Sequence, residues 1–249
     1  MDAADLRLSE IETLWSVVRR AHDGAGNSLR SAQQTLLDRY GRAIRRYLLG
    51  ALRSEEAADD LYQEFSVKFL SGAFAGADPA RGRFRSFVKS SIFRMVVDHQ
   101  RRQQRQARVQ PLPADELPGA AGDELLAEQE RAFAQSWRQE LLARCWESLS
   151  RLERDTKRPY HTTLRFRADH PDLNSAQLAE ALAQQTGQQL TAGNVRVMLH
   201  RAREKFSDLL LDAVQETLAD PTRDQLEEEL IELDLIGYCR PALDRRRGG

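Results

Sequence analysis

Residues 54–70 read SEEAADDLYQEFSVKFL, and this short stretch decides the fold class. Ser54 is a hydroxyl-bearing N-cap, and the carboxylates of Glu55 and Glu56 follow it at the positive end of a helix dipole. Apolar residues recur every four positions and define one face, namely Ala57, Leu61, Phe65 and Phe69. The other face is acidic and polar, with Glu56, Asp59, Asp60, Gln63 and Glu64. This periodicity predicts an amphipathic helix.

The segments on both sides have helical spacing as well. Residues 33–52, QQTLLDRYGRAIRRYLLGAL, place large apolar and aromatic side chains three and four positions apart. Residues 71–82, SGAFAGADPARG, are rich in Gly, Ala and Pro and predict a loop. Residues 81–102, RGRFRSFVKSSIFRMVVDHQRR, form a third helical pattern. Phe84 and Phe87 fit core packing there better than an alternative role in base stacking.

The second half of the chain is also helical in pattern. Three prolines and two glycines predict a flexible linker over residues 109–123, and a long helix is predicted from Glu124 to Leu152. Two helices follow, one over 175–185 and one from the N-cap Thr191, with Gly187 between them, which is typical of a helix-turn-helix. The predicted fold is all-α, with two small helical domains over residues 1–108 and 124–211 and an acidic extension over 212–249.

Charge is sorted strongly along a chain whose net charge is only −1. Residues 81–108 contain nine Arg or Lys and one Asp, whereas residues 212–234 contain nine Asp or Glu and one Arg. The basic segment indicates either a solvated helix face or a surface for a polyanion. No apolar run is long enough for a membrane span, no export signal is evident, and there are two cysteines. We therefore expect a cytoplasmic protein that does not bind membranes.

Motifs of catalysis and of cofactor binding are missing from the sequence. It contains no Gly-rich phosphate loop, no nucleophile elbow and no HExxH pattern. Cys145, His161 and His170 lack the spacing of zinc ligands. We therefore expect no enzyme activity, no cofactor and no metal.

Taken together, two separate segments resemble the sigma-70 family of bacterial transcription initiation factors, in particular its compact extracytoplasmic-function (ECF) group. Residues 36–48 (LLDRYGRAIRRYL), 54–70 and 78–102 (DPARGRFRSFVKSSIFRMVVDHQRR) resemble conserved region 2 of the family in order and spacing. Residues 190–206, LTAGNVRVMLHRAREKF, are similar to the recognition helix of region 4. The two domains would then be region 2-like and region 4-like.

The resemblance implies an alternative sigma factor, with core RNA polymerase and promoter DNA as its partners. It would contact the clamp and flap regions of the polymerase, recognise the −10 and −35 elements and promote DNA melting. An anti-sigma factor or another regulator is a further partner to expect. The residues that match the clamp-binding helix are Asp59, Asp60, Leu61, Gln63 and Glu64. Simple solvation of the acidic side chains remains the alternative.

For DNA, the resemblance implies two groups of residues. The group for the −10 element comprises Arg81, Arg83, Arg85, Lys89, Arg94, Asp98, His99, Arg101 and Arg102. The group for the −35 element comprises Thr191, Asn194, Arg196, His200, Arg201, Arg203 and Lys205. Asn and Arg suit base edges, whereas Arg203 and Lys205 suit phosphates or, alternatively, a solvated helix end. His200 fits a base contact and a phosphate contact equally well.

Two features depart from the family pattern. Residues 155–175 are longer and more polar than the usual connection before the helix-turn-helix. The tail from Asp212 onward predicts an acidic amphipathic helix that ends at Gly237 and Pro241. We interpret this helix as a cap on the second domain and hypothesise that it also covers a basic DNA-binding surface.

Two other classes of function stay open at this point. A repressor or activator that never contacts polymerase would need the helix-turn-helix but not the acidic helix over residues 54–70. A helical inhibitor that mimics a sigma domain would not need the basic faces.

Overall fold

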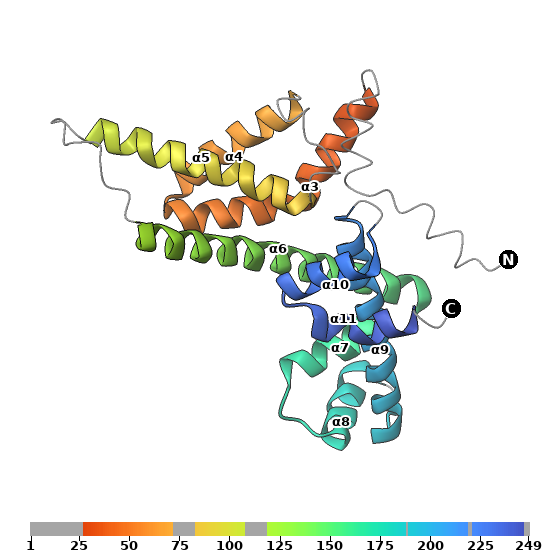
Figure 1. Cartoon of the computed structure of the whole chain (residues 1–249). Helices are drawn as coiled ribbons and strands as arrows, with labels where there is room; N and C mark the ends of the chain where they lie inside the picture. The colour runs from red at the N-terminus through yellow and green to blue at the C-terminus, as the bar shows by residue number, and fades with distance from the viewer. Residues whose placement is uncertain (1–26, 72–82, 108–118, 188, 219–220, 247–249) are drawn as a thin grey trace. The chain divides into compact units, whose positions relative to one another are not determined.

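The computed structural model describes residues 27–71, 83–107, 119–187, 189–218 and 221–246, and all regular elements in these ranges are helices (Figure 1). The predicted all-α fold is thereby confirmed. The contacts divide the chain into unit 1, with Met1–Glu140 and Gln215–Leu233, and unit 2, with Leu141–Val214 and Asp234–Gly249. These limits differ from those of the predicted domains, because the long helices α6 and α9 each contribute to both units.

Unit 1 is built on three helices that contact one another: α3 (Asn27–Leu52), α4 (Glu55–Leu70) and α5 (Phe84–Ala107). It also contains the first part of α6 (Gly119–Thr156) and the whole of α10 (Arg223–Glu232). Ser54 caps α4 as predicted, since its Oγ accepts a hydrogen bond of 3.2 Å from the amide of Ala57. The apolar face of α4 is buried at Leu61, Phe65 and Phe69.

An aromatic cluster forms the centre of unit 1. The ring of Tyr40 on α3 stacks on Trp137 of α6 with centroids 4.4 Å apart and planes 5° apart. Phe84 of α5 lies 6.3 Å from both rings, and Phe133 lies 5.8 Å from Trp137. Phe84 is only 2% exposed, which confirms the prediction that it packs in the core.

Gly41 allows α3 and α4 to approach closely. A Cβ atom at this position would lie 2.2 Å from the hydroxyl oxygen of Tyr62 on α4. Any larger residue would therefore displace Tyr62, which belongs to the acidic helix singled out by its sequence. The absence of a side chain at Gly41 thus makes room for the ring of Tyr62 against α3.

Unit 2 contains the second part of α6 with α7 (Tyr160–Asp169), α8 (Ser175–Thr186), α9 (Ala192–Gln215) and α11 (Ile236–Arg245). Asn174 caps α8 in a capping box with Gln177, and Gly187 ends α8 in the left-handed conformation with φ of 69°. The two helices predicted for the helix-turn-helix are therefore present (Figure 1). Their shared core consists of Leu178, Ala179, Leu182, Val195 and Leu199.

Several predicted boundaries are corrected by the structure. Helix α6 begins at Gly119, so the last residues of the predicted linker are helical. Helix α7 occupies the polar connection before α8, where no helix was predicted. It is stabilised by Glu153, whose carboxylate accepts hydrogen bonds from the amide and the hydroxyl of Thr162 at 2.8 and 2.6 Å.

The prediction of one acidic helix that ends at Gly237 and Pro241 is wrong, because the tail forms two helices. Helix α10 ends before Asp234, which adopts a φ of 53°, a left-handed conformation that Asp tolerates better than most residues. Gly237 and Pro241 lie inside α11. The interpretation of this tail as a cap on the second domain is wrong for α10, which belongs to unit 1, whereas α11 belongs to unit 2.

Burial of the Cys239 thiol on α11 leads to a prediction about pH. Burial raises its pKa from 9.0 to about 12, so above pH 9 the thiol ionises in the unfolded chain but stays protonated in the folded one. The free energy of unfolding should therefore fall with rising pH, by about 1.4 kcal/mol between pH 8 and pH 10 from this group. Urea unfolding at both pH values checks this, and a Cys239→Ala variant should lack that part of the loss. An equal pH dependence in both proteins would contradict the assignment.

Candidate nucleic-acid interface

The exposed face of α4 combines acidic, polar and apolar side chains. Asp60 and Gln63 are exposed, and Val67, one further turn along, is 65% exposed. Positions 60, 63 and 67 share one helix face, so these three side chains form a continuous strip. Val67 was missed from the sequence, although its spacing of seven residues from Asp60 places it on this strip. We call Asp60, Gln63 and Val67 the α4 strip.

The other predicted residues of α4 are engaged within unit 1. Leu61 is 3% exposed, so its side chain belongs to the core and not to an exposed surface. Asp59 accepts hydrogen bonds of 2.5 and 3.0 Å from Arg45, and these bonds lower the pKa of its carboxyl group. Glu64 accepts a 2.7 Å hydrogen bond from Lys68 and lies 3.8 Å from Arg102 of α5.

The basic residues at the beginning of α5 are paired with carboxylates. Arg83 lies 2.7 to 2.8 Å from Glu228, Glu229 and Glu232 of α10. Arg85 donates from Nε and Nη2 to the two carboxylate oxygens of Glu229, at 2.7 and 3.1 Å, and also to Glu232. We call these five residues the Arg/Glu cluster. Lys89, one turn further along α5, lies 2.7 Å from Glu130 of α6.

Two members of the Arg/Glu cluster are buried, which is unusual for charged side chains. Arg85 is 4% exposed and Glu229 is 0% exposed. Burial by itself would lower the pKa of Arg85, but the carboxylates of Glu229 and Glu232 more than offset it and raise the pKa. Arg85 is therefore charged and fully engaged. While Arg85 is buried and paired in this way, it cannot make the predicted contact with DNA.

The later part of α5 presents its charges to solvent. Of the predicted residues, Arg94, Asp98, Arg101 and Arg102 are exposed, and His99 is half-buried. Arg105 is exposed as well and follows Arg94 and Arg101 on the same face, because α5 continues to Ala107. We call Arg94, Arg101, Arg102 and Arg105 the α5 strip. Arg81 lies outside the described residues.

Helix α9 and Thr191, which directly precedes it, carry the predicted residues for the −35 element, and every one of them is exposed. Thr191 and Asn194 bond reciprocally, since Asn194 Oδ1 accepts from the Thr191 amide at 3.2 Å and Thr191 Oγ1 accepts from the Asn194 amide at 3.1 Å. This arrangement fixes the first turn of α9. Val195 and Leu199 are buried on the other face, so packing orients the polar face outward.

Two further side chains modify this face of α9. Val197 is 49% exposed between the polar residues. Its exposure was not predicted, because it lies only two positions from the buried Val195. His200 Nε2 lies 3.7 Å from the carboxylate of Glu204, one turn further along α9. The face thus offers an amide, guanidinium groups, an imidazole and one apolar contact.

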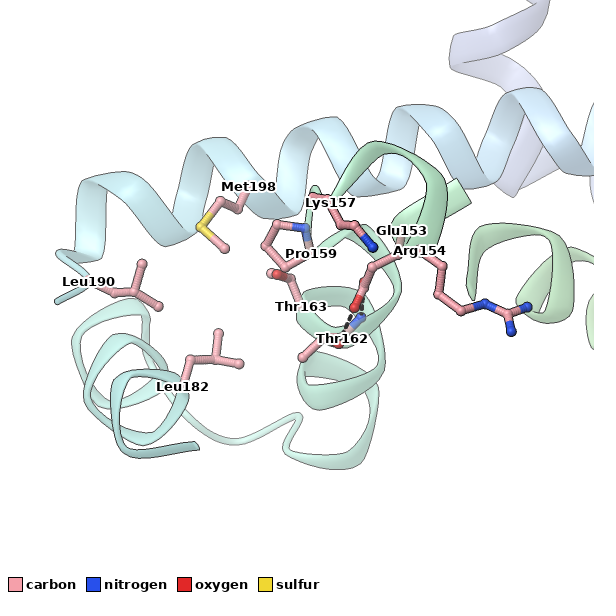
Figure 2. A pocket seen from close by; sticks show the side chains of 9 residues that line it. All are labelled: Glu153, Arg154, Lys157, Pro159, Thr162, Thr163, Leu182, Leu190 and Met198. Carbon is pink, nitrogen blue, oxygen red and sulfur yellow. Dashed lines mark hydrogen bonds between the residues drawn. The ribbon is translucent and has the colours of Figure 1, made fainter. Parts of the chain in front are cut away.

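A pocket of about 320 Å³ lies in unit 2 among α6, α7, α8 and α9 (Figure 2). Figure 2 shows Leu182, Leu190 and Met198 around its apolar part and Arg154 and Lys157 on the side of α6. The hydroxyl oxygen of Thr163 is buried in its lining and has no hydrogen-bond partner among the described residues. The side of the pocket with Leu182, Leu190 and Met198 therefore suits an apolar group, and the lining also includes two cations, Arg154 and Lys157, and the carboxylate of Glu153.

Within the described ranges, no group of three His, Cys, Asp or Glu residues could hold a metal ion. Among the same residues, no helix combines the length and the apolar character that a bilayer span requires.

Comparison with known proteins found a family likeness for the segment that contains most of α3 and α5 and the whole of α4. Residues 36–106, less than a third of the chain, match the family model described as Sigma-70 region 2. Residues 36–106 are therefore similar to region 2 of the sigma-70 family of transcription initiation factors. Comparisons with curated proteins and with solved structures gave no significant match.

Proposed function

We propose that this chain, whose residues 36–106 match sigma-70 region 2, is an alternative sigma factor of the ECF type that acts in the cytoplasm. It binds core polymerase, recognises the −10 and −35 elements and promotes melting of the promoter. The observation that carries this proposal is the order of the elements. A region 2 domain with an acidic α4 and a basic α5 is followed by a helix-turn-helix with an exposed polar face.

The α4 strip is the proposed docking surface for the polymerase clamp. Asp60 and Gln63 offer a charge and a hydrogen-bonding group, and Val67 adds apolar surface that loses water on binding. Such a combination steers a basic partner and anchors it after contact. Leu61 supports this surface from beneath and does not contact the partner.

The α5 strip is the proposed grip on the −10 region. Its guanidinium groups are exposed along the later part of one helix, and each can neutralise a phosphate with release of counterions. His99 and Asp98 lie between them along the helix. A strand held in this way can have a base extruded without ATP, provided that binding offsets the loss of stacking.

The exposed face of α9 is the proposed reader of the −35 element. Asn194 and Arg196 can pair with adenine and guanine in the major groove, and Val197 can contact a thymine methyl group. Arg203 and Lys205, further along the helix, suit phosphates. The α5 strip and the exposed face of α9 together would account for recognition of two promoter elements by one chain.

The pocket of unit 2 is the proposed seat for the polymerase flap. Leu182, Leu190 and Met198 can receive one apolar side chain from a flap segment, and Arg154 and Lys157 can attract acidic residues beside it. This use accounts for an apolar hollow on a domain whose helix α9 otherwise presents polar side chains to solvent.

One experiment separates this proposal from the two alternatives. The purified full chain is added to core RNA polymerase with a library of promoter fragments, and specific run-off transcripts are measured. We expect transcripts that depend on the chain. Binding to DNA operators without binding to core polymerase would support a repressor or activator, and binding to core polymerase without initiation would support a mimic.

Charge reversal on the α4 strip tests the clamp contact. Asp60→Arg should weaken binding to core polymerase about tenfold, which corresponds to about 1.4 kcal/mol, because it places a positive charge against a basic partner. Asp38→Arg on the exposed side of α3 changes the net charge equally and should leave the affinity unchanged. Fluorescence anisotropy of labelled chain titrated with core polymerase measures both. Equal losses in the two variants would contradict a specific surface.

A further inference from the structure

The Arg/Glu cluster joins two oppositely charged segments that lie far apart in the sequence. The guanidinium of Arg83 faces three carboxylates, with Glu229 at 2.8 Å and Glu228 and Glu232 at 2.7 Å. Arg85 is bound in bidentate fashion by Glu229. A guanidinium has five N–H donors in one plane. Nη1 and Nη2 of Arg83, and Nε and Nη2 of Arg85, thus face carboxylate oxygens, which is the arrangement that a phosphate group would also require.

The two arginines differ in how firmly they are held. Arg85 and Glu229 are both buried, so solvent and salt screen their attraction weakly. The side chain of Arg83 is 19% exposed, and its partners Glu228 and Glu232 are 65% and 53% exposed. Exposed ion pairs contribute little, because water and salt screen them. The contacts of Arg83 to Glu228 and Glu232 are therefore the ones that another anion displaces first.

We propose that α10 is an internal competitor of nucleic acid, which holds Arg83 and Arg85 on carboxylates until phosphates of a bound DNA strand replace them. This inference rests on the proposed DNA contact by α5. The α5 strip begins eleven residues after Arg83, about 16 Å along the helix, and it stays exposed while α10 is in place. DNA therefore meets the α5 strip first and gains the two arginines only when α10 withdraws.

A double variant weakens the exposed part of the cluster and keeps its buried pair. Glu228→Gln with Glu232→Gln removes two charges that face Arg83 and leaves the bidentate contact between Arg85 and Glu229. The matched control is Asp224→Asn with Glu227→Gln, which makes the same charge change on the same helix; Glu227 faces Arg223 of α10. Thermal unfolding of each variant verifies that it folds.

Affinity for a labelled single-stranded DNA of mixed sequence is measured over a series of salt concentrations. Release of Arg83 should add one phosphate contact, which steepens the slope of log affinity against log salt by about 0.7 and tightens binding about fivefold at 0.1 M salt. The control should match the wild type. Addition of Arg83→Gln should cancel the gain in the double variant and should weaken binding by a smaller factor in the wild type, where α10 must first withdraw.

Hydrogen exchange of the full wild-type chain gives a second readout. DNA binding should accelerate exchange of the amides in α10, whereas a purely structural helix would keep its protection. An unchanged salt slope in the double variant, or an Arg83→Gln effect of equal size in the wild type, would overturn the proposal.

The variant Arg94→Gln with Arg101→Gln distinguishes a failure of the proposed DNA contact by α5 from a failure of the proposed competition by α10. If it binds DNA as the wild type does, the proposed −10 contact fails; if it weakens binding while the α10 variants do not change it, only the competition fails.

Discussion

Replacement of Glu229 by glutamine is expected to lower the free energy of unfolding of unit 1 by about 3–5 kcal/mol. The carboxylate is completely buried and accepts two hydrogen bonds from Arg85, which is buried as well. The neutral amide would leave the charge of Arg85 in the interior with Glu232 as its remaining partner from α10. Urea unfolding followed by circular dichroism measures the loss.

Two companion variants identify the cause of that loss. Glu227→Gln alters a half-buried carboxylate that faces Arg223 on the same helix at 2.8 Å, and it should cost no more than about 0.5 kcal/mol. Arg85→Met combined with Glu229→Leu removes both buried charges and should cost less than Glu229→Gln alone, because no unpaired charge remains. A Glu229→Gln variant as stable as the wild type would show that the buried pair does not hold α10 in unit 1.

Truncation of Trp137 to alanine should have an effect of similar size. The indole is 0% exposed and stacks on Tyr40 at 4.4 Å, with Phe84 and Phe133 around it. Removal of a buried aromatic side chain costs about 3–5 kcal/mol through lost apolar burial and the cavity that is left. The midpoint of urea unfolding should fall accordingly.

The control for Trp137 is its replacement by phenylalanine. The indole N–H has no hydrogen-bond acceptor among the described residues, so this change removes no hydrogen bond and keeps an aromatic ring beside Tyr40. We expect Trp137→Phe to retain most of the stability. Equal destabilisation by phenylalanine and alanine would mean that ring stacking contributes little and that the full volume of the indole is what matters.

Local signals in the sequence were sufficient for much of the fold. The cap at Ser54 and the spacing of Leu61, Phe65 and Phe69 predicted α4, and Gly187 predicted the end of α8. These signals act within one or two turns of a helix, so they can be read without knowledge of the partners. The exposure of the predicted residues on α9 followed for the same reason, since Val195 and Leu199 define the buried side.

Features of the structure that depend on a partner in another element could not be predicted from the sequence. Helix α7 has no clear apolar stripe and is supported by Glu153 of α6, nine residues before Thr162. Arg83 and Arg85 look like any exposed basic residues until Glu229, 144 residues beyond Arg85, is placed beside them. The sequence therefore predicted the charge of the candidate site correctly but not which of its arginines are already occupied.

Helix α10 lies late in the sequence but belongs to unit 1, and this has a consequence for synthesis on the ribosome. Arg85 is translated 144 residues before Glu229, so at about 5–20 residues per second the arginine precedes its carboxylate by roughly 7 to 30 s. During that interval the nascent polypeptide has a basic helix without its acidic counterpart. A product of premature termination would keep both arginines unneutralised, so translation must proceed almost to its end before the Arg/Glu cluster can assemble.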